Sequence, residues 1–256
     1  MNNVTGIIVS YNTPDLLKKC YDSIRKFYPS MKLIIIDGSP IGSDCYNYAS
    51  SLSGTSTAVV VVTDLSGKAN RIFHAGDVVT ERNFPIGNFK KLISGGYIKI
   101  KVTESDINII VTPGYNIGHG NGMKMGISLC KTEYFLLIDS DVTIDKPGVI
   151  EEMMSCMEEN YYGIGQIMQV NDKGMNVGEG IYYLHPHFAL ISKRAYEKFS
   201  PFINHGAPCI SAMLDLNENM KYVIDSFPVH KYITHAERGT RKQRPSTFHS
   251  KHWDKI

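Results

Sequence analysis

The sequence predicts an α/β protein whose central sheet is mainly parallel. Large apolar residues run together in Gly6–Ser10, Lys32–Ile36 and Phe135–Ile138. Such runs are typical of strands that are buried on both faces, as in the centre of a parallel sheet. Between the first two runs, apolar residues recur at helical spacing from Leu16 to Phe27. The order strand, helix, strand indicates a doubly wound, three-layer domain.

The start of the first helix is marked by its own residues. Thr13 is suited to the N-cap and Pro14 to the first helical position, and Pro29 ends the pattern. Farther along, a glycine-rich loop precedes a predicted helix at 122–131, and Asp145 begins another. Further strands are predicted at 59–62, 107–111, 166–170, 188–191 and 222–224.

The stretch 64–104 differs from the core pattern. It is polar at first and then contains a short helical segment and an alternating segment, Tyr97–Val102. We interpret it as a possible inserted subdomain, and a long elaborated loop is an equal alternative. The remaining chain reads as one domain over 1–241, followed by a tail at 242–256.

Composition excludes several classes of protein. The chain has 256 residues, 43% hydrophobic and 20% charged, with a net charge of +2, which gives no argument for nucleic-acid binding. Five cysteines without short spacings argue against a disulfide framework or a zinc ribbon and favour a cytoplasmic protein. We find neither a signal-peptide pattern nor an apolar run long enough for a membrane span, so we expect at most peripheral membrane contact, possible at the inner face.

Two carboxylates follow the third apolar run. Asp139 and Asp141 are separated by one small residue, directly after Ile138. Ligands of open α/β sheets bind beyond the carboxyl ends of the strands. Two hard oxygen donors at that place suit Mg2+ or Mn2+ shared with substrate phosphates. The alternative is that these residues only form a turn, which Asp and Ser favour.

Other polar segments converge on the same sheet edge. They are the turn Ser10–Asn12, Asp37 at the end of the second strand, and the loop Asn116–Asn121 with its glycines before a helix N-terminus. Two common nucleotide motifs are absent. The first strand is not followed by a glycine fingerprint, and Gly67-Lys68 lacks the remaining residues of a P-loop.

These pieces together resemble the family 2-like glycosyltransferases of the GT-A fold. The matching segments are 8–12, 35–39, 116–122, and Asp139-Ser140-Asp141 as a version of the DXD motif of that family. They occur in the order of the family over roughly the first 145 residues, apart from the inserted stretch. The resemblance implies a nucleotide-binding half at about 1–145 and an acceptor half at about 146–241.

The resemblance also implies roles for individual residues. Asp141 looks like the direct metal ligand, Asp139 like the acid that faces the ribose or the metal, and His235 like the histidine that often completes the metal site. Asp37 would read the base, although it could instead be a turn cap. Arg238 and Arg241 could clamp the diphosphate. The remaining positions implied for nucleotide contact are Ser10, Tyr11, Asn12, Asn116, Gly118 and Asn121.

The acceptor-side base departs from the pattern of the family. Inverting members use a carboxylate in an acidic segment, and here only Asp215 remains, beside Ala212 and Met213. His187, in the sequence His185-Pro186-His187, is an alternative because histidine can act as a base near neutral pH. A retaining enzyme would need neither, and Asp215 could equally be helix surface.

The sequence therefore predicts a metal-dependent glycosyltransferase. The donor would be a nucleotide-diphosphate sugar, with UDP favoured by the resemblance, and the acceptor a hydroxyl of a glycan, lipid-linked or small molecule. One alternative is a degenerate protein that binds nucleotide sugars or glycans without turnover. Another is a sugar nucleotidyltransferase, although such enzymes usually have a basic glycine-rich loop after the first strand. A homo-oligomer is possible as well.

Overall fold

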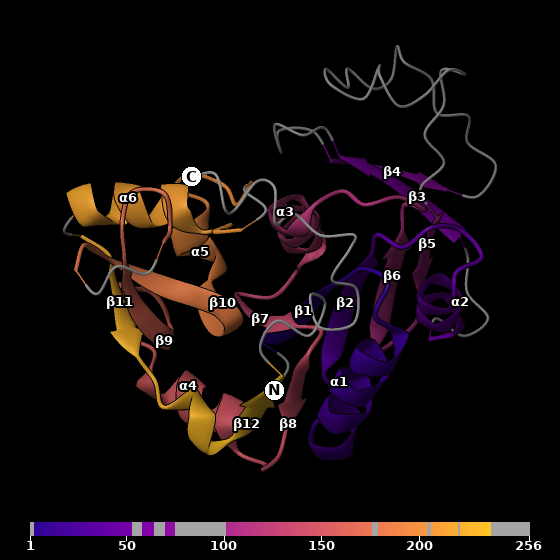
Figure 1. Cartoon of the computed structure of the whole chain (residues 1–256), viewed down its shortest axis with the longest axis horizontal. Coiled ribbons are helices and arrows are strands. Elements are labelled where there is room, and N and C mark those ends of the chain that lie inside the picture. The colour runs from indigo at the N-terminus through magenta and orange to yellow at the C-terminus, as the bar shows by residue number, and fades with distance from the viewer. Residues whose placement is uncertain are drawn as a thin grey trace.

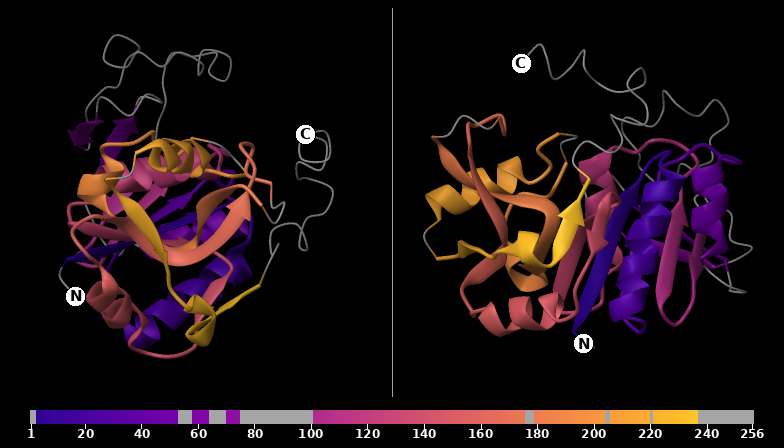
Figure 2. Two further views of the ribbon diagram at one scale, coloured as in Figure 1. Left: turned by 90° about the vertical axis from the view of Figure 1, so that its left-hand side faces the viewer. Right: turned by 60° about the horizontal axis from the view of Figure 1, so that its bottom comes forward.

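The protein folds around one twisted sheet with helices on both faces (Figure 1). The structure, a computed structural model, describes residues 3–52, 58–63, 70–74, 101–175, 179–203, 206–219 and 221–236. Its ten-stranded sheet has the order β11-β9-β10-β7-β1-β2-β6-β5-β3-β4. The N-terminal and C-terminal halves of the chain lie side by side along this sheet (Figure 2, right).

The centre of the sheet is parallel, as the sequence predicts. Strand β1 (Val4–Ser10) pairs in parallel with both β2 (Lys32–Asp37) and β7 (Tyr134–Asp139), and β2 pairs in parallel with β6 (Asn108–Thr112). These are the apolar runs of the sequence, buried almost throughout. Their register places Ser10 beside Asp37 and Val9 beside Asp139, so their carboxyl ends meet at one edge.

The C-terminal half extends the sheet with longer strands. Strand β10 (Ile181–Ser192) pairs antiparallel with β7 and with β9 (Tyr161–Val170), and β11 (Val223–Ser226) runs parallel to β9. A separate two-stranded sheet pairs β8 (Val142–Ile144) with β12 (Ile233–His235). The short helix α5 (Lys193–Tyr196) follows β10, and the single 3-10 turn η2 (Val229–Lys231) precedes β12.

Helices form the outer layers. One apolar cluster joins a face of the sheet to α1 (Pro14–Phe27), α2 (Asp44–Ser51) and α4 (Val149–Cys156). The other cluster joins the opposite face to α3 (His119–Leu129), α5 and α6 (Ile210–Glu218). Alternate residues of β1 divide between them, since Ile7 belongs to the second cluster and Ile8 to the first. The three-layer arrangement is the one predicted.

Local details differ from the sequence prediction. The sequence predicts Leu16 in the buried stripe of α1. In the structure Leu17 is buried there instead, and Leu16 is only partly buried. Thr13 is the N-cap of α1, but its hydroxyl makes no capping hydrogen bond. Helix α3 begins at His119 rather than at 122, and β9 begins at Tyr161 rather than at 166.

The possible subdomain at 64–104 lies largely outside the described residues. Within it the structure describes β4 (Asn70–His74) and β5 (Lys101–Glu104). Both continue the main sheet through β3 (Ala58–Thr63), with β5 antiparallel to β6. The tail at 242–256 also lies outside the described residues.

Candidate active site

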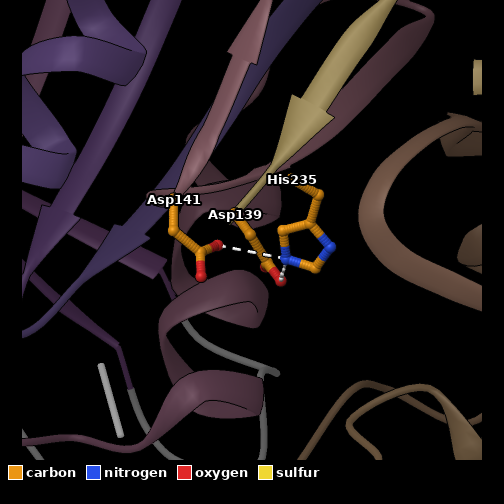
Figure 3. Close-up of side chains that lie close together, drawn as sticks. All are labelled: Asp139, Asp141 and His235. Atoms are coloured by element: carbon orange, nitrogen blue, oxygen red, sulfur yellow. Dashed lines mark ion pairs between the residues drawn. The ribbon is translucent and has the colours of Figure 1, made fainter. Parts of the chain in front are cut away.

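The Asp139 and Asp141 side chains lie at the end of β7, where His235 reaches them from β12 (Figure 3). The Nε2 atom of His235 is 3.2 Å from Oδ1 of Asp141 and 3.9 Å from Oδ2 of Asp139. One ligand atom from each of the three residues falls within a 4.8 Å cluster. Pairing of His235 with Val142 in the β8–β12 sheet, and a 3.0 Å hydrogen bond from Ala236 N to the Asp141 carbonyl oxygen, hold the residues together.

The chemistry of this cluster fits a divalent cation. Adjacent ligands of an octahedral Mg2+ lie about 3 Å apart, because each metal–oxygen distance is about 2.1 Å. The 3.2 Å separation between His235 and Asp141 is close to that spacing. Oδ1 of Asp139 is also buried and makes no aligned hydrogen bond, although Nε2 of His119 lies 3.3 Å from it.

Histidine side chains surround Asp139. His119, from the first turn of α3, has Nε2 3.3 Å from Oδ1 of Asp139. Burial alone would raise the pKa of Asp139, but His119, His185 and His235 together bring the pKa of this carboxyl well below its usual value. Asp139 is therefore a carboxylate at neutral pH, the form that binds a metal ion.

His187 is also brought to this place by β10. It is buried, its ring stacks on that of His235, and its Nδ1 lies 2.7 Å from Nδ1 of His185. Burial, with smaller contributions from the neighbouring histidines, lowers the pKa of His187 to about 3, and burial also lowers the pKa of His185. Both rings are neutral near pH 7.

A second polar group surrounds Asp37 at the end of β2. Oδ1 of Asp37 accepts hydrogen bonds from the Ser39 hydroxyl at 2.7 Å and the Cys45 thiol at 3.2 Å. Oδ2 is buried and has no hydrogen-bond partner. Burial raises the pKa of Asp37 above the ordinary carboxyl value, and the hydrogen bonds oppose that effect only in part. This buried acceptor atom is free for a ligand that donates a hydrogen bond.

The turn after β1 joins the Asp37 group. Asn12 has a left-handed backbone with φ of 55°, and its N–H donates to the Ser39 hydroxyl at 2.8 Å. Oγ of Ser10 lies 3.2 Å from the Cys45 sulfur. Gly38 N donates to the Ser10 carbonyl oxygen. Ser10, Asn12 and Asp37 are thus brought together, and Tyr11 lies in the same turn.

The loop before α3 packs against the same turn. A Cβ atom on Gly38 would lie 3.1 Å from the carbonyl oxygen of Tyr115, which shows how closely the two backbones approach. Asn116 Oδ1 accepts from Gly118 N, and Asn121 Nδ2 donates to the Ile117 carbonyl oxygen. Asn116 and Asn121 therefore stabilise the loop itself, and Gly118 has a φ of 82° that favours glycine.

Asp215 has a structural contact. Its Oδ2 accepts a 2.7 Å hydrogen bond from the backbone N–H of Ser200, in the connection after α5. The neighbouring Ala212 and Met213, at the positions where an acidic pair is expected, are buried in the core. Arg238 and Arg241 lie outside the described residues.

Sequence reasoning missed three residues of these groups. His119 lies inside the glycine-rich loop segment, but nothing in the segment indicates that it faces Asp139. Ser39 and Cys45 follow Asp37 closely, yet a serine and a lone cysteine have many roles. The Cys45 contact arises because α2 packs on β2, whereas Ser39 lies in the turn directly after β2.

The comparisons with known proteins agree with this geometry. The model of the family described as glycosyl transferase family 2 matches residues 96–215. No curated protein matches the sequence significantly. No helix in the described part of the chain is long and apolar enough to cross a bilayer.

Two solved structures share the fold. A mannosyltransferase from Pyrobaculum calidifontis, in complex with GDP-Man and Mn2+, has a TM-score of 0.54 and 12% identity over 88% of this chain. A glucosyl-3-phosphoglycerate synthase from Mycobacterium tuberculosis, in complex with Mn2+, UDP and glucosyl-3-phosphoglycerate, has a TM-score of 0.52 and 11% identity over 94% of this chain. The matches cover 55% and 74% of those chains, so this chain spans about half the length of the mannosyltransferase.

At these identities the structural likeness shows the fold alone, and that fold is the GT-A fold predicted from the sequence. The family match adds the sequence relationship. Residues 96–215 thus match the glycosyl transferase family 2 model, and the chain has the GT-A fold of these two glycosyltransferases.

Proposed function

We propose that this protein transfers a sugar from a nucleotide-diphosphate sugar, with UDP-sugar favoured, to a hydroxyl of a glycan, lipid-linked or small acceptor, and that it uses Mn2+ or Mg2+. The observation that carries the proposal is the cluster of Asp139, Asp141 and His235, which lies at the same sheet edge as the buried acceptor Asp37. Departure of the nucleotide leaves negative charge on its diphosphate. When bound, a divalent ion neutralises that charge.

The residues of the chain divide this work between two subsites. Asp141 and His235 would hold the ion, with Asp139 completing the site or facing the ribose. Asp37 would accept a hydrogen bond from an N–H of the base through Oδ2, because Oδ1 is already used by Ser39 and Cys45. Ser10, Tyr11 and Asn12 would line the base side, and the loop with Asn116, Gly118 and Asn121 the other side.

Asp37 alone does not select uracil over other bases. A carboxylate accepts equally well from the N3–H of uracil and from the N–H groups of guanine. The solved structures of similar fold contain UDP in one case and GDP-Man in the other. A donor screen that includes both nucleotides therefore tests the proposal more sharply than UDP alone.

The test begins with thermal unfolding of the full chain. UDP with Mn2+ should raise the melting temperature, and a ligand at 100 times its Kd adds about 2.7 kcal/mol to the free energy of unfolding. Incubation with a panel of sugar nucleotides, followed by mass analysis, then identifies the sugar that is transferred or released. The proposed donor site is wrong if no nucleotide diphosphate shifts the melting temperature.

A second candidate function is nucleotide-sugar binding without turnover. The contact of Asp215 with Ser200 and the burial of Ala212 and Met213 favour it, because the one carboxylate of that segment already accepts a hydrogen bond from the backbone. A protein of this kind would show the UDP and Mn2+ shift without product or slow hydrolysis. Hydrolysis that disappears in Asp141→Ala would establish the enzyme.

A further inference from the structure

A break in β10 places two histidines beside the proposed metal site. The pairing of β10 with β9 changes register between Leu184 and Ala189, and His185 and His187 lie in that interval. Regular pairing with β7 includes Phe188 opposite Ile138, directly before Asp139. The two histidines thus lie in an irregular interval of β10, directly before the residue that pairs next to Asp139.

The ring of His187 contacts two other imidazole rings, whose centroids are 6.3 Å apart. It stacks on His235 with a centroid distance of 4.7 Å and an interplanar angle of 14°. It meets His185 at 4.7 Å and 61°. His187 is 2% exposed, so its position is set by packing.

The hydrogen bonds between His185 and His187 fix the proton positions. The backbone N–H of His187 points to Nδ1 of His185 at 3.3 Å, and a backbone N–H can only donate. Nδ1 of His185 is therefore the acceptor. In the 2.7 Å contact between the two Nδ1 atoms, the proton then belongs to His187. This tautomer ties the plane of the His187 ring to the β10 backbone.

We propose that His187 is a positioning residue for His235, and this inference rests on the proposed metal-dependent function. His235 ends a strand of only three residues, and the strand pairing fixes its backbone rather than the rotation of its ring. A flat buried ring parallel to it restricts that rotation and keeps Nε2 directed at Asp141. Hydrogen-bond partners that orient a metal-binding histidine typically change metal affinity about 10–100-fold, and a stacked ring would restrict the same rotation.

The inference differs from a base role for His187. A base must reach the acceptor hydroxyl, whereas a positioning residue acts through the ring that it contacts. The first role predicts slow chemistry with unchanged metal binding. The second predicts weak metal binding in the absence of any substrate.

The test measures Mn2+ binding to the full chain without nucleotide, by electron paramagnetic resonance of the free ion. His187→Ala removes the stacked ring and should weaken Mn2+ binding about 10–100-fold. His187→Phe keeps a flat ring and should lose less than His187→Ala. His230→Ala is the matched control, because His230 is exposed on η2, and should bind Mn2+ as the unmodified protein does.

Two further measurements separate the possible failures. Thermal melting checks that each variant folds. If His187→Ala fails to fold, His187→Phe still tests the inference, because its ring preserves the core volume. Long-range nitrogen–proton NMR spectra should show the His187 proton on Nδ1. The inference is overturned if His187→Ala binds Mn2+ within twofold of the unmodified protein while His235→Ala does not. If Asp141→Ala and His235→Ala also bind normally, the metal site itself is wrong and this inference falls with it.

Discussion

Nε2 of His235 lies 3.2 Å from Oδ1 of Asp141, although the two residues belong to distant parts of the sequence. The contact depends on the short β8–β12 sheet, in which the residue after Asp141 pairs with His235. The imidazole comes from β12 and the carboxylate from the residue directly before β8, so a change in that pairing would separate them. The candidate metal site is consequently a product of tertiary structure.

Asp141→Asn should abolish Mn2+-dependent binding of UDP. The amide keeps the size of the side chain but removes the charge that a divalent cation requires. Loss of a residue that merely hydrogen-bonds to a metal ligand typically lowers metal affinity about 10–100-fold. Because Asp141 would be a ligand itself, we expect Mn2+ affinity to fall by at least that factor. Titration calorimetry with and without UDP measures it. Asp22→Asn, at an exposed carboxylate of α1, is the control and should change nothing.

Removal of metal ions should weaken donor binding, as Asp141→Asn does. Excess chelator should eliminate most of the rise in melting temperature that UDP produces, because the diphosphate charge is then opposed only by the protein. Added Mn2+ should restore the shift in the unmodified protein and in Asp22→Asn, but not in Asp141→Asn. A UDP shift that is insensitive to the chelator would contradict the metal requirement.

Asp37→Asn should stabilise the fold while weakening donor binding. A buried carboxylate with a raised pKa costs free energy when it is charged, and a neutral amide of the same shape avoids that cost. An increase of 1 kcal/mol in the free energy of unfolding corresponds to about 2–4 °C in melting temperature for a chain of this size. The amide nitrogen cannot accept from the base, so UDP affinity should fall about tenfold, or about 1.4 kcal/mol.

The pH dependence of that stability difference has a definite sign. The folded pKa of Asp37 lies above the unfolded value of 3.8, so the folded state holds the proton more tightly. The unmodified protein should therefore lose stability relative to Asp37→Asn as the pH rises from about 4 through the folded pKa, and the difference should be constant above it. Melting curves of both proteins from pH 4 to 8 measure this. A difference that shrinks with rising pH would be the opposite result.

Gly122→Ala should destabilise the protein through α3. A Cβ atom there would lie 2.6 Å from Cγ1 of Val9, so either the helix or the Val9 side chain must shift. The loss should be about 1–3 kcal/mol, despite the higher helix propensity of alanine. Adding Val9→Ala should recover part of this loss, because it removes the clashing atoms. Val4→Ala, elsewhere on β1, should combine additively with Gly122→Ala in denaturant unfolding.

Asp215→Ala should affect stability more than chemistry. It leaves the Ser200 N–H without its acceptor, and we expect a loss of about 1–3 kcal/mol in the free energy of unfolding. Glu218→Ala, at an exposed position of the same helix, should have little effect. Turnover should fall less than about tenfold. A decrease in kcat of about 100-fold or more at unchanged donor affinity would instead identify Asp215 as the base.

Much of the donor side could be predicted because its residues are local. The apolar runs before Ser10, Asp37 and Asp139 identify parallel strands, and parallel strands present their carboxyl ends at one edge. The acceptor side could not be predicted in the same way. Asp215 lies on an amphipathic helix, and the sequence of that helix does not reveal that the Asp215 carboxylate accepts a hydrogen bond from the Ser200 N–H.

The sequence by itself determined the three-layer fold, the parallel centre of the sheet and the edge where Asp37, Asp139 and Asp141 meet, since hydrophobic periodicity and strand ends are local properties. The tertiary structure decided how His119, His187 and His235 gather around that edge, although the family resemblance already implied a metal-site role for His235. Their positions depend on the first turn of α3, a register break in β10 and the pairing of β12 with β8. Such long-range pairings leave no periodic signal in the chain, because each is set by packing between segments that are distant in sequence.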